Sequence, residues 1–336
     1  MKNRIYLLTG AAGLLGSNVS RQLIDQGEKV RALVLKGDPA MKYVPKGAEI
    51  FKGDVLDIES LERLFNVPEG TDIIMIHSAS IVTLDPNPNP KVHAVNVDGT
   101  QNIIDMCIKH KAKKLVYISS TGAIPEKPGN EPIKEVYTFD PDAVVGYYSV
   151  TKAEATQLVI DALKKYPELD ASVVHPTGIC GPNDYAFGPV SSFLIQYAKG
   201  EMSTGIAGNF NSVDVRDLAE GVIACCEKGR RGDCYIMGNS LVSMEDMFKI
   251  VNRAAGLNYK PKILPVSVAK ILAKVMAVIS KITRKPAMLT DFAIYNLARN
   301  NNFCYDKAVK ELGYKVRPFE ETITDEIKWL KAEGKI

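Results

Sequence analysis

A glycine-rich turn at residues 10–16 constrains the fold of this chain more than any other segment. It follows an apolar run at residues 4–9 that is typical of a buried strand, and it precedes an amphipathic helical pattern. A strand, a glycine turn and a helix within about 30 residues form the context of a dinucleotide-binding unit, in which phosphates lie at the helix N-terminus. Gly10 permits the tight turn, Gly13 permits close approach of a pyrophosphate, and Gly16 permits close packing of the helix on the strand. The spacing is G-x-x-G-x-x-G, and a plain strand-to-helix loop is the alternative interpretation.

Strand and helix patterns then alternate along the first half of the chain. Further strands are predicted at residues 29–35, 48–52, 72–76, 114–118 and 171–175. Helices are predicted at residues 58–65, 91–110 and 148–165. This alternation predicts an α/β fold of the Rossmann type, with a doubly wound parallel sheet whose ligands bind beyond the carboxyl ends of the strands.

The second half departs from simple alternation and predicts a smaller lobe. We expect residues 1–182 to form the dinucleotide-binding domain, completed by residues 212–238. The smaller, mostly helical substrate-binding lobe is expected from residues 183–211 and 239–336. Helices are predicted at residues 214–227, 245–255 and 268–282, and a strand at residues 233–237.

The end of the second predicted strand bears on the choice of cofactor. An NAD-binding chain typically places an acid there to accept hydrogen bonds from the adenosine ribose. This chain has Lys36 at that point and Lys42 shortly after it. A cation favours a 2′-phosphate, so we expect NADP(H), with NAD(H) as the alternative if Lys36 is only a solvated loop charge. After the third strand, Asp54 and the adjoining Val55 are expected near the adenine.

Small and hydroxyl side chains follow the next two strands, at the edge of the sheet where a dinucleotide would lie. Ser78, Ala79 and Ser80 follow the fourth strand and permit close approach of a cofactor. The fifth strand ends at Ile118 and is followed by three hydroxyl side chains at residues 119–121.

Tyr148 and Lys152 stand four residues apart in the helix predicted after the fifth strand. That spacing places the phenol and the ammonium on one helix face. Of the 14 tyrosines, Tyr148 is the one that has a lysine four residues later. A solvated surface contact is the ordinary interpretation of such a pair. Because this helix follows the fifth strand, however, Tyr148 falls in the same cleft as Thr121 and the expected cofactor, and we interpret the pair as catalytic.

Together these segments resemble the extended short-chain dehydrogenase/reductase superfamily, which includes NAD-dependent epimerase/dehydratase-like proteins. The branch they resemble most contains dihydroflavonol-reductase-like proteins and is similar to hydroxysteroid dehydrogenases. The matching segments span nearly the whole chain and are residues 10–16, 53–54, 96–100, 119–121, 148–152, 175–182, 213–217 and 312–329.

The resemblance implies a mechanism for the matching residues. Tyr148 would exchange a proton with the substrate oxygen, and Lys152 would reach the nicotinamide ribose and lower the pKa of Tyr148 from its ordinary value of about 10. Thr121 would hydrogen-bond the reacting oxygen while the nicotinamide transfers a hydride. Asn96 is expected to support the active-site backbone, with an ordinary helix-interior asparagine as the alternative. Residues 176–179 would lie against the nicotinamide.

The strand ends and the resemblance together give one set of expected cofactor contacts. These are Gly10, Gly13, Leu14, Leu15, Gly16, Lys36, Lys42, Asp54, Val55, Ser78, Ala79, Ser80, Asn96, Ile118, Ser119, Tyr148, Lys152, Pro176, Thr177, Gly178 and Ile179.

Three further segments have two interpretations each. His175 stands where relatives commonly have Arg; we expect a packing role at a strand end, with a substrate contact as the alternative. Residues 183–211 are rich in Gly, Pro and aromatic side chains, and the resemblance makes them a lid over the nicotinamide as well as core of the small lobe. The helix at residues 268–282 is expected to form core or pocket roof, with a basic helix lying on a membrane surface as the alternative. Its apolar stripe is Val268, Ile271, Leu272, Val275, Ile279 and Ile282.

Composition argues against several classes of function. The net charge of +3 is too slight to suggest a nucleic-acid partner. The apolar runs fall short of the roughly 18 residues that a membrane span needs. The four histidines show no metal-ligand spacing, so no metal is expected. The six cysteines show no C-x-x-C spacing and suit buried, reduced thiols, which together with the absence of an export signal favours a cytoplasmic protein.

These observations favour an NADP(H)-dependent oxidoreductase acting on a ketone or secondary alcohol of a fairly apolar small molecule. A nucleotide-sugar epimerase is the alternative, with arginines of the small lobe holding the sugar diphosphate, and a non-catalytic dinucleotide sensor is a third class. Dehydratases of the superfamily carry an acidic pair after the fifth-strand hydroxyl, where this chain has Gly122 and Ala123. A homodimer through the helices that hold Asn96 and Tyr148 is possible.

Overall fold

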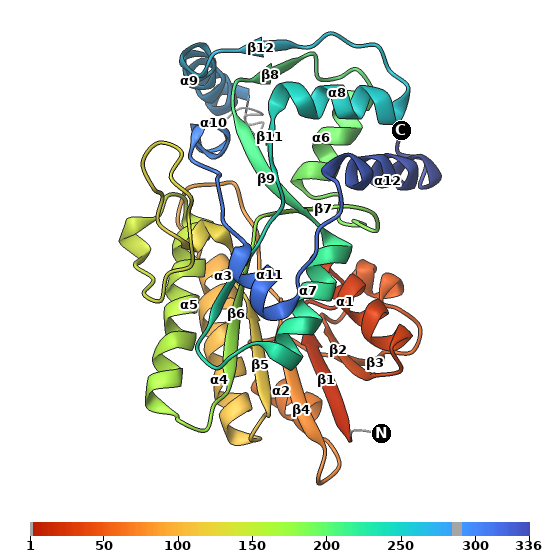
Figure 1. The fold of residues 1–336 in the computed structure, drawn as a ribbon, viewed down its shortest axis with the longest axis vertical. Helices are drawn as coiled ribbons and strands as arrows, with labels where there is room; N and C mark the ends of the chain where they lie inside the picture. The colour runs from red at the N-terminus through yellow and green to blue at the C-terminus, as the bar shows by residue number, and fades with distance from the viewer. Residues whose placement is uncertain (1–2, 284–290) are drawn as a thin grey trace.

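A seven-stranded parallel sheet forms the centre of the larger part of the molecule (Figure 1). The computed structural model describes the backbone of residues 3–283 and 291–336, and the side chains of residues 3–276 and 291–336. The strand order is β10-β6-β5-β4-β1-β2-β3, with every neighbouring pair parallel. The strands are β1 (Arg4–Thr9), β2 (Lys29–Val34), β3 (Glu49–Lys52), β4 (Asp72–His77), β5 (Lys114–Ile118), β6 (Ala171–Pro176) and β10 (Cys234–Met237). The order reverses between β1 and β4, and the predicted α/β fold of the Rossmann type is confirmed.

Helices cover both faces of this sheet, so its strands are apolar on both sides. One face packs against α2 (Ile58–Phe65), α4 (Gly99–Lys109) and α5 (Tyr147–Lys165), and the other against α1 (Leu14–Asp25), α7 (Val215–Lys228) and α11 (Asp306–Leu312). In β1, Ile5 and Leu7 enter the first core while Tyr6 and Leu8 enter the second. This two-residue alternation explains why the apolar run at residues 4–9 is continuous.

The glycine turn has the geometry that its spacing predicts. Gly10 has a φ of +67°, and a Cβ added there would lie 2.8 Å from the backbone nitrogen of Ala79. A Cβ on Gly16 would lie 2.2 Å from the carbonyl oxygen of Gly10, so α1 can approach β1 this closely only with glycine at that position. The N-terminus of α1 therefore begins directly beyond the end of β1, next to the end of β4.

The remaining elements form a smaller, mixed region (Figure 1). Its strands are β7 (Gly178–Cys180), β9 (Asn209–Asp214) and β11 (Leu241–Ser243) in one sheet, and β8 (Thr204–Ile206) and β12 (Lys262–Leu264) in another. Its helices are α6 (Pro189–Ala198), α8 (Met244–Ala255), α9 (Val266–Thr283), α10 (Asp291–Ala298) and α12 (Phe319–Ala332). The region is less purely helical than expected, because four of its five strands have only three residues, too few for a periodic pattern to register.

The helix predicted at residues 268–282 is present as α9, but the expectation that its apolar stripe is buried as core is wrong for the described side chains. Val268, Ile271, Leu272 and Val275 are 40–65% exposed, whereas Ala269 and Ala273 are buried against Ile206 and Ile294. The helix packs through its small side chains, because alanines let its backbone lie close to its neighbours. Ile279 and Ile282, the other two members of the predicted stripe, lie outside the described side chains.

The cysteines and the helices bear on two expectations from the sequence: free, buried thiols, and helices that do not span a membrane. All six cysteines are free thiols and five of them are buried, with Cys304 only partly covered. Within the described residues, each helix is too short or too polar to span a bilayer.

A buried carboxyl group fastens α12 to the segment that follows β7. Glu326 is fully buried, and its Oε2 accepts a hydrogen bond from the backbone N–H of Gly181. The hydroxyl of Ser191 lies 2.7 Å from Glu326 Oε1 and 2.7 Å from Asp184 Oδ2. A serine hydroxyl has one proton, so it cannot donate to two carboxylates at once. Burial raises the pKa of Glu326 to about 8, so the neutral acid can donate to Ser191, which in turn donates to Asp184.

This arrangement predicts a pH dependence of stability that Glu326→Gln removes. Folded Glu326 keeps its proton up to about pH 8, whereas in the unfolded chain it loses the proton near its ordinary pKa of 4.5. Between these values folding takes up a proton, so the free energy of unfolding falls as pH rises, by up to about 1.4 kcal/mol per pH unit. Urea unfolding of both proteins from pH 5 to pH 8 measures the difference in slope. Glu320→Gln, at an exposed site on the same helix, is the control, and equal slopes in all three proteins would refute the protonated state.

Candidate functional site

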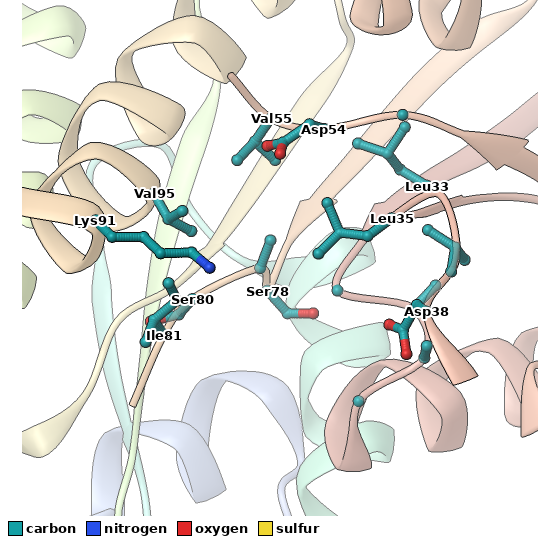
Figure 2. A pocket seen from close by; sticks show the side chains of 17 residues that line it. Leu33, Leu35, Asp38, Asp54, Val55, Ser78, Ser80, Ile81, Lys91 and Val95 are labelled. Atoms are coloured by element: carbon teal, nitrogen blue, oxygen red, sulfur yellow. The ribbon is translucent and has the colours of Figure 1, made fainter. Parts of the chain in front are cut away.

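A cavity of about 450 Å³ lies at the carboxyl edge of the sheet, where the strand order reverses (Figure 2). Its walls come from the glycine turn and from the ends of β2, β3 and β4. The expected cofactor contacts that line it are Gly10, Gly13, Asp54, Val55, Ser78, Ala79 and Ser80. Asp38, Ile81, Lys91 and Val95 also line it, although their sequence context gave no signal for this.

The end of β2 presents an acid to this cavity instead of the two expected cations. Asp38 lines the cavity together with Leu35, and its carboxylate accepts a hydrogen bond from the backbone N–H of Ala40 at 2.8 Å. Lys36 and Lys42 are not among the lining residues; the Lys42 ammonium lies 4.8 Å from the centre of the Tyr43 ring.

A buried histidine fixes the backbone where β4 meets the cavity. His77 is 1% exposed, with Nδ1 2.7 Å from Thr9 Oγ1 and Nε2 3.1 Å from Thr100 Oγ1. Thr100 donates its own proton to a backbone carbonyl, so it accepts from Nε2–H, and Thr9 donates to Nδ1. The Thr9 oxygen then accepts the backbone N–H groups of Ser78 and Ala79, each at 3.2 Å. Burial lowers the pKa of His77 to about 3, so the ring is neutral and the network is stable across the physiological range.

Asn96 joins the same loop to α5. It lies in a π-helical turn (Ala94–Asp98) that links α3 (Pro90–His93) to α4. Its amide nitrogen donates to Ile81 O and to Thr151 Oγ1, both at 3.1 Å, and its oxygen accepts from the Ile81 N–H at 2.8 Å and from the Ser80 hydroxyl at 3.1 Å. The side chain is 1% exposed and thus holds the β4 loop against the helix of Tyr148 and Lys152.

Lys152 is a buried cation with unused hydrogen-bonding capacity. It is 1% exposed, and its ammonium donates to Ile118 O at 2.6 Å and lies 4.5 Å from the centre of the Tyr117 ring. Burial lowers its pKa to about 7. An ammonium has three N–H donors, and within the described residues one of them has a partner.

The hydroxyls of Ser120 and Thr121, which follow β5, have different surroundings, and the role expected of Thr121 stays a prediction. The Ser80 and Ser120 side chains lie close to the Tyr148 phenol. Ser120 Oγ accepts the Gly122 N–H at 3.0 Å, so its own proton is free to be donated. Thr121 instead donates to Pro176 O at 3.2 Å. The reason is a 3-10 turn at Thr121–Ala123, which directs this side chain towards β6. Three consecutive hydroxyl residues gave the sequence no basis for choosing between them.

The expected effect of Lys152 on Tyr148 stays a prediction. Burial raises the pKa of Tyr148, and the nearby Ser80 and Ser120 hydroxyls oppose that rise only partly. The Lys152 ammonium contacts Ile118 O and the Tyr117 ring.

Two residues at the end of β6 complete the site. His175 is fully buried, stacks on Phe139 at 5.2 Å between ring centres, and has Nδ1 3.0 Å from Ser120 O, as the packing interpretation requires. The buried Thr177 hydroxyl has no hydrogen-bond partner within the described residues. The glycine turn, the free donors of Lys152 and this unpaired hydroxyl together fit a nicotinamide dinucleotide.

The aromatic segment after β7 contacts both regions of the molecule. Tyr185 stacks on Tyr43, with ring centres 3.5 Å apart and planes 3° apart, so the segment reaches the end of β2. Further along, Phe193 and Tyr197 of α6 pack against Phe248 of α8.

The described residues include no group of three His, Cys, Asp or Glu side chains that could hold a metal ion.

Comparison with known proteins agrees with this geometry. The model of the NAD dependent epimerase/dehydratase family matches residues 6–238. The chain belongs to this family. Within it, the chain is similar to a Synechocystis protein provisionally named as a dihydroflavonol 4-reductase, at 27% identity over 98% of this chain and 95% of the relative.

One further relative and two solved structures are also similar to this chain. Sterol demethylase protein B of Methylococcus capsulatus is 30% identical over 69% of this chain and 68% of its own length. The crystal structure of gox2253 superposes with a TM-score of 0.85 at 29% identity, covering 99% of both chains. The UDP-glucose 4-epimerase of Thermus thermophilus, solved with NAD, shares the fold with a TM-score of 0.75 at 20% identity, covering 97% of this chain and 99% of its own.

Proposed function

We propose that this chain is an oxidoreductase that reduces a ketone, or oxidises a secondary alcohol, of a fairly apolar small molecule. NADP(H) is the cofactor that the cations Lys36 and Lys42 favour, and NAD(H) is the alternative that Asp38 in the cavity wall favours. The observation that carries the proposal is the position of Tyr148. The helix α5 places its phenol close to the hydroxyls of Ser80, which lines the cavity, and Ser120, one helical turn from the buried Lys152. A proton donor and a cation at a dinucleotide cleft are what carbonyl reduction requires.

Each residue has a distinct task in this proposal. The glycine turn and the free N–H groups of α1 hold the pyrophosphate, and Lys152 uses its two remaining N–H donors on the nicotinamide ribose. The bound nicotinamide supplies the hydride. Ser120 donates to the carbonyl oxygen, and Tyr148 donates the proton. Because burial raises the pKa of Tyr148, the phenol is protonated at neutral pH and can donate to a carbonyl oxygen.

The names of several relatives support an apolar substrate. They include sterol demethylase protein B, sterol-4-alpha-carboxylate 3-dehydrogenase of Saccharomyces cerevisiae and a farnesyl-dihydroquinoline-oxide ketoreductase of Stigmatella aurantiaca. These names share an oxidisable or reducible oxygen on a large apolar ring system. A sterol-like or prenylated cyclic ketone is therefore the substrate class to test first.

One observation favours the epimerase alternative. Arg299 keeps its Nε buried without a hydrogen-bond partner within the described residues, and its guanidinium lies over Tyr295 and Phe303. A sugar-nucleotide diphosphate could use such a group. Other arginines late in the chain are less suited to hold a diphosphate. Arg230 and Arg253 are paired with acids, and Arg231 donates to backbone carbonyls. Arg284 lies outside the described residues.

Tyr148→Phe tests the proposed proton transfer. The variant keeps the ring but loses the proton, so turnover of a ketone substrate should fall by about 10²-fold or more while NADPH binding stays the same. NADPH oxidation with a panel of sterol-like ketones, aryl ketones and UDP-sugars measures turnover, and fluorescence titration measures binding. A variant with full activity would refute the role of Tyr148. Conversion of UDP-sugars to their epimers without net oxidation of the cofactor, measured by chromatography of the products, would favour the epimerase.

Ser120→Ala and Thr121→Val separate the two candidate hydroxyls. Ser120→Ala removes the donor beside Tyr148 and should lower kcat by about 10²-fold. Thr121→Val keeps the volume and loses only the hydrogen bond to Pro176 O, which contributes about 1 kcal/mol to stability, so kcat should change little. Steady-state kinetics on both variants decide the assignment, and the reverse pattern would return the role to Thr121.

Lys36→Ala and Asp38→Asn test the cofactor preference. If Lys36 contacts a 2′-phosphate, Lys36→Ala should weaken NADPH by about 10-fold and leave NADH unchanged, the scale of a hydrogen bond to a charged group. Asp38→Asn removes a negative charge from the same end of the cavity and should strengthen NADPH binding. Equal effects of Lys36→Ala on both cofactors would contradict the preference for NADP(H).

A further inference from the structure

Lys91 is the one cationic side chain among the described residues that line the cavity. Its stem extends from α3 into the cavity between Val95 and Ser80 (Figure 2). The other charged side chains of the lining, Asp38 and Asp54, are both acids. A cavity proposed to hold an anionic dinucleotide therefore has one cationic side chain in its lining. The proposed mechanism gives this side chain no role.

Neither the helix N-terminus nor an ion pair within the described residues explains a positively charged side chain at position 91. It lies in the first turn of a helical stretch that continues through α4, and Asn89 Oδ1 caps that turn by accepting the Lys91 backbone N–H at 3.0 Å. A positive charge at a helix N-terminus is disfavoured by the helix dipole. Lys91 is exposed, and within the described residues neither an acid nor another hydrogen-bond partner contacts its ammonium, so water solvates it. An anionic ligand in the cavity would take the place of this water.

The backbone of Lys91 is held firmly enough to aim its side chain. The neighbouring Val92 is 3% exposed, and Asn96, one turn further along, is bonded to both backbone groups of Ile81. The aliphatic stem of Lys91 shares the cavity wall with Ile81 and Val95, so the ammonium reaches the cavity while the stem lies on apolar surface.

We propose that Lys91 binds the pyrophosphate of the dinucleotide from the wall facing the glycine turn. A Cβ on Gly10 would lie 2.8 Å from Ala79 N, so the turn adjoins one end of the Ser78–Ser80 strip, and Lys91 lies at the other end beside Ser80. A pyrophosphate over this strip meets the backbone N–H groups of the turn on one side and a full positive charge on the other. The 2′-phosphate would instead lie by Leu35 and Asp38, across the cavity from Lys91 (Figure 2). The inference rests on the proposed function only in requiring a dinucleotide.

Binding measurements on Lys91→Met test this contact without relying on catalysis. Met keeps most of the stem and removes the charge. Isothermal titration at low ionic strength with ADP, adenosine, adenosine 2′,5′-bisphosphate and NADPH compares the phosphates one at a time. Lys91→Met should weaken ADP and NADPH by about 10-fold, leave adenosine unchanged, and reduce the dependence of ADP affinity on salt. Lys91→Arg should retain most of the affinity. Lys29→Met, at the opposite end of the sheet, is the matched control and should match the wild type.

The alternative outcomes are distinct. Wild-type affinity for ADP in Lys91→Met would overturn the proposal while leaving the oxidoreductase intact. If Lys91→Met weakened the binding of adenosine 2′,5′-bisphosphate and NADPH alone, Lys91 would contact the 2′-phosphate of the ribose, and the proposal would be overturned. Failure of the wild type to bind any dinucleotide would overturn the proposed function and the Lys91 contact together.

Discussion

The rest of the site depends on keeping Lys152 charged inside the protein. A desolvated ammonium with one carbonyl partner is held at a cost, which the lowered pKa of about 7 reflects. The fold bears this cost because α5 is fixed against the cavity through Thr151 and Asn96, and because the Tyr117 ring lies under the ammonium. Strained or incompletely paired groups of this kind are concentrated where a protein binds or transforms a ligand. In the proposed function, the two remaining donors of Lys152 bind the nicotinamide ribose.

Much of the sheet could be predicted from the sequence because its signals are local. The runs that became β1, β5 and α2 have the bounds their periodicity indicated, and Gly10 and Gly16 have the steric roles their spacing required. These features depend on a few neighbouring residues: a continuous apolar run, a turn that needs positive φ, and a contact too close for a Cβ.

What the sequence could not predict depends on contacts between distant segments. Ser120 faces Tyr148 only because a 3-10 turn redirects Thr121 to Pro176. Lys91 faces the cavity only because the end of β4 and the turn before α4 meet across it. The described part of α9 packs through alanines and leaves its larger side chains exposed, the reverse of what an apolar stripe ordinarily indicates. In each case the sequence pattern predicted the helix or strand but not the distant segment that it contacts.

The central proposal is that this cleft transfers a hydride between a dinucleotide and a carbonyl carbon. The most direct measurement uses NADPH with two deuterium atoms at C4 of the dihydronicotinamide ring, so that either face delivers label. After single turnover with a sterol-like cyclic ketone, the product is analysed by mass spectrometry. Hydride transfer should give an alcohol with one deuterium on the carbinol carbon, and none in a reaction with unlabelled NADPH. Turnover that leaves no deuterium in the product would contradict hydride transfer as the chemistry of this site.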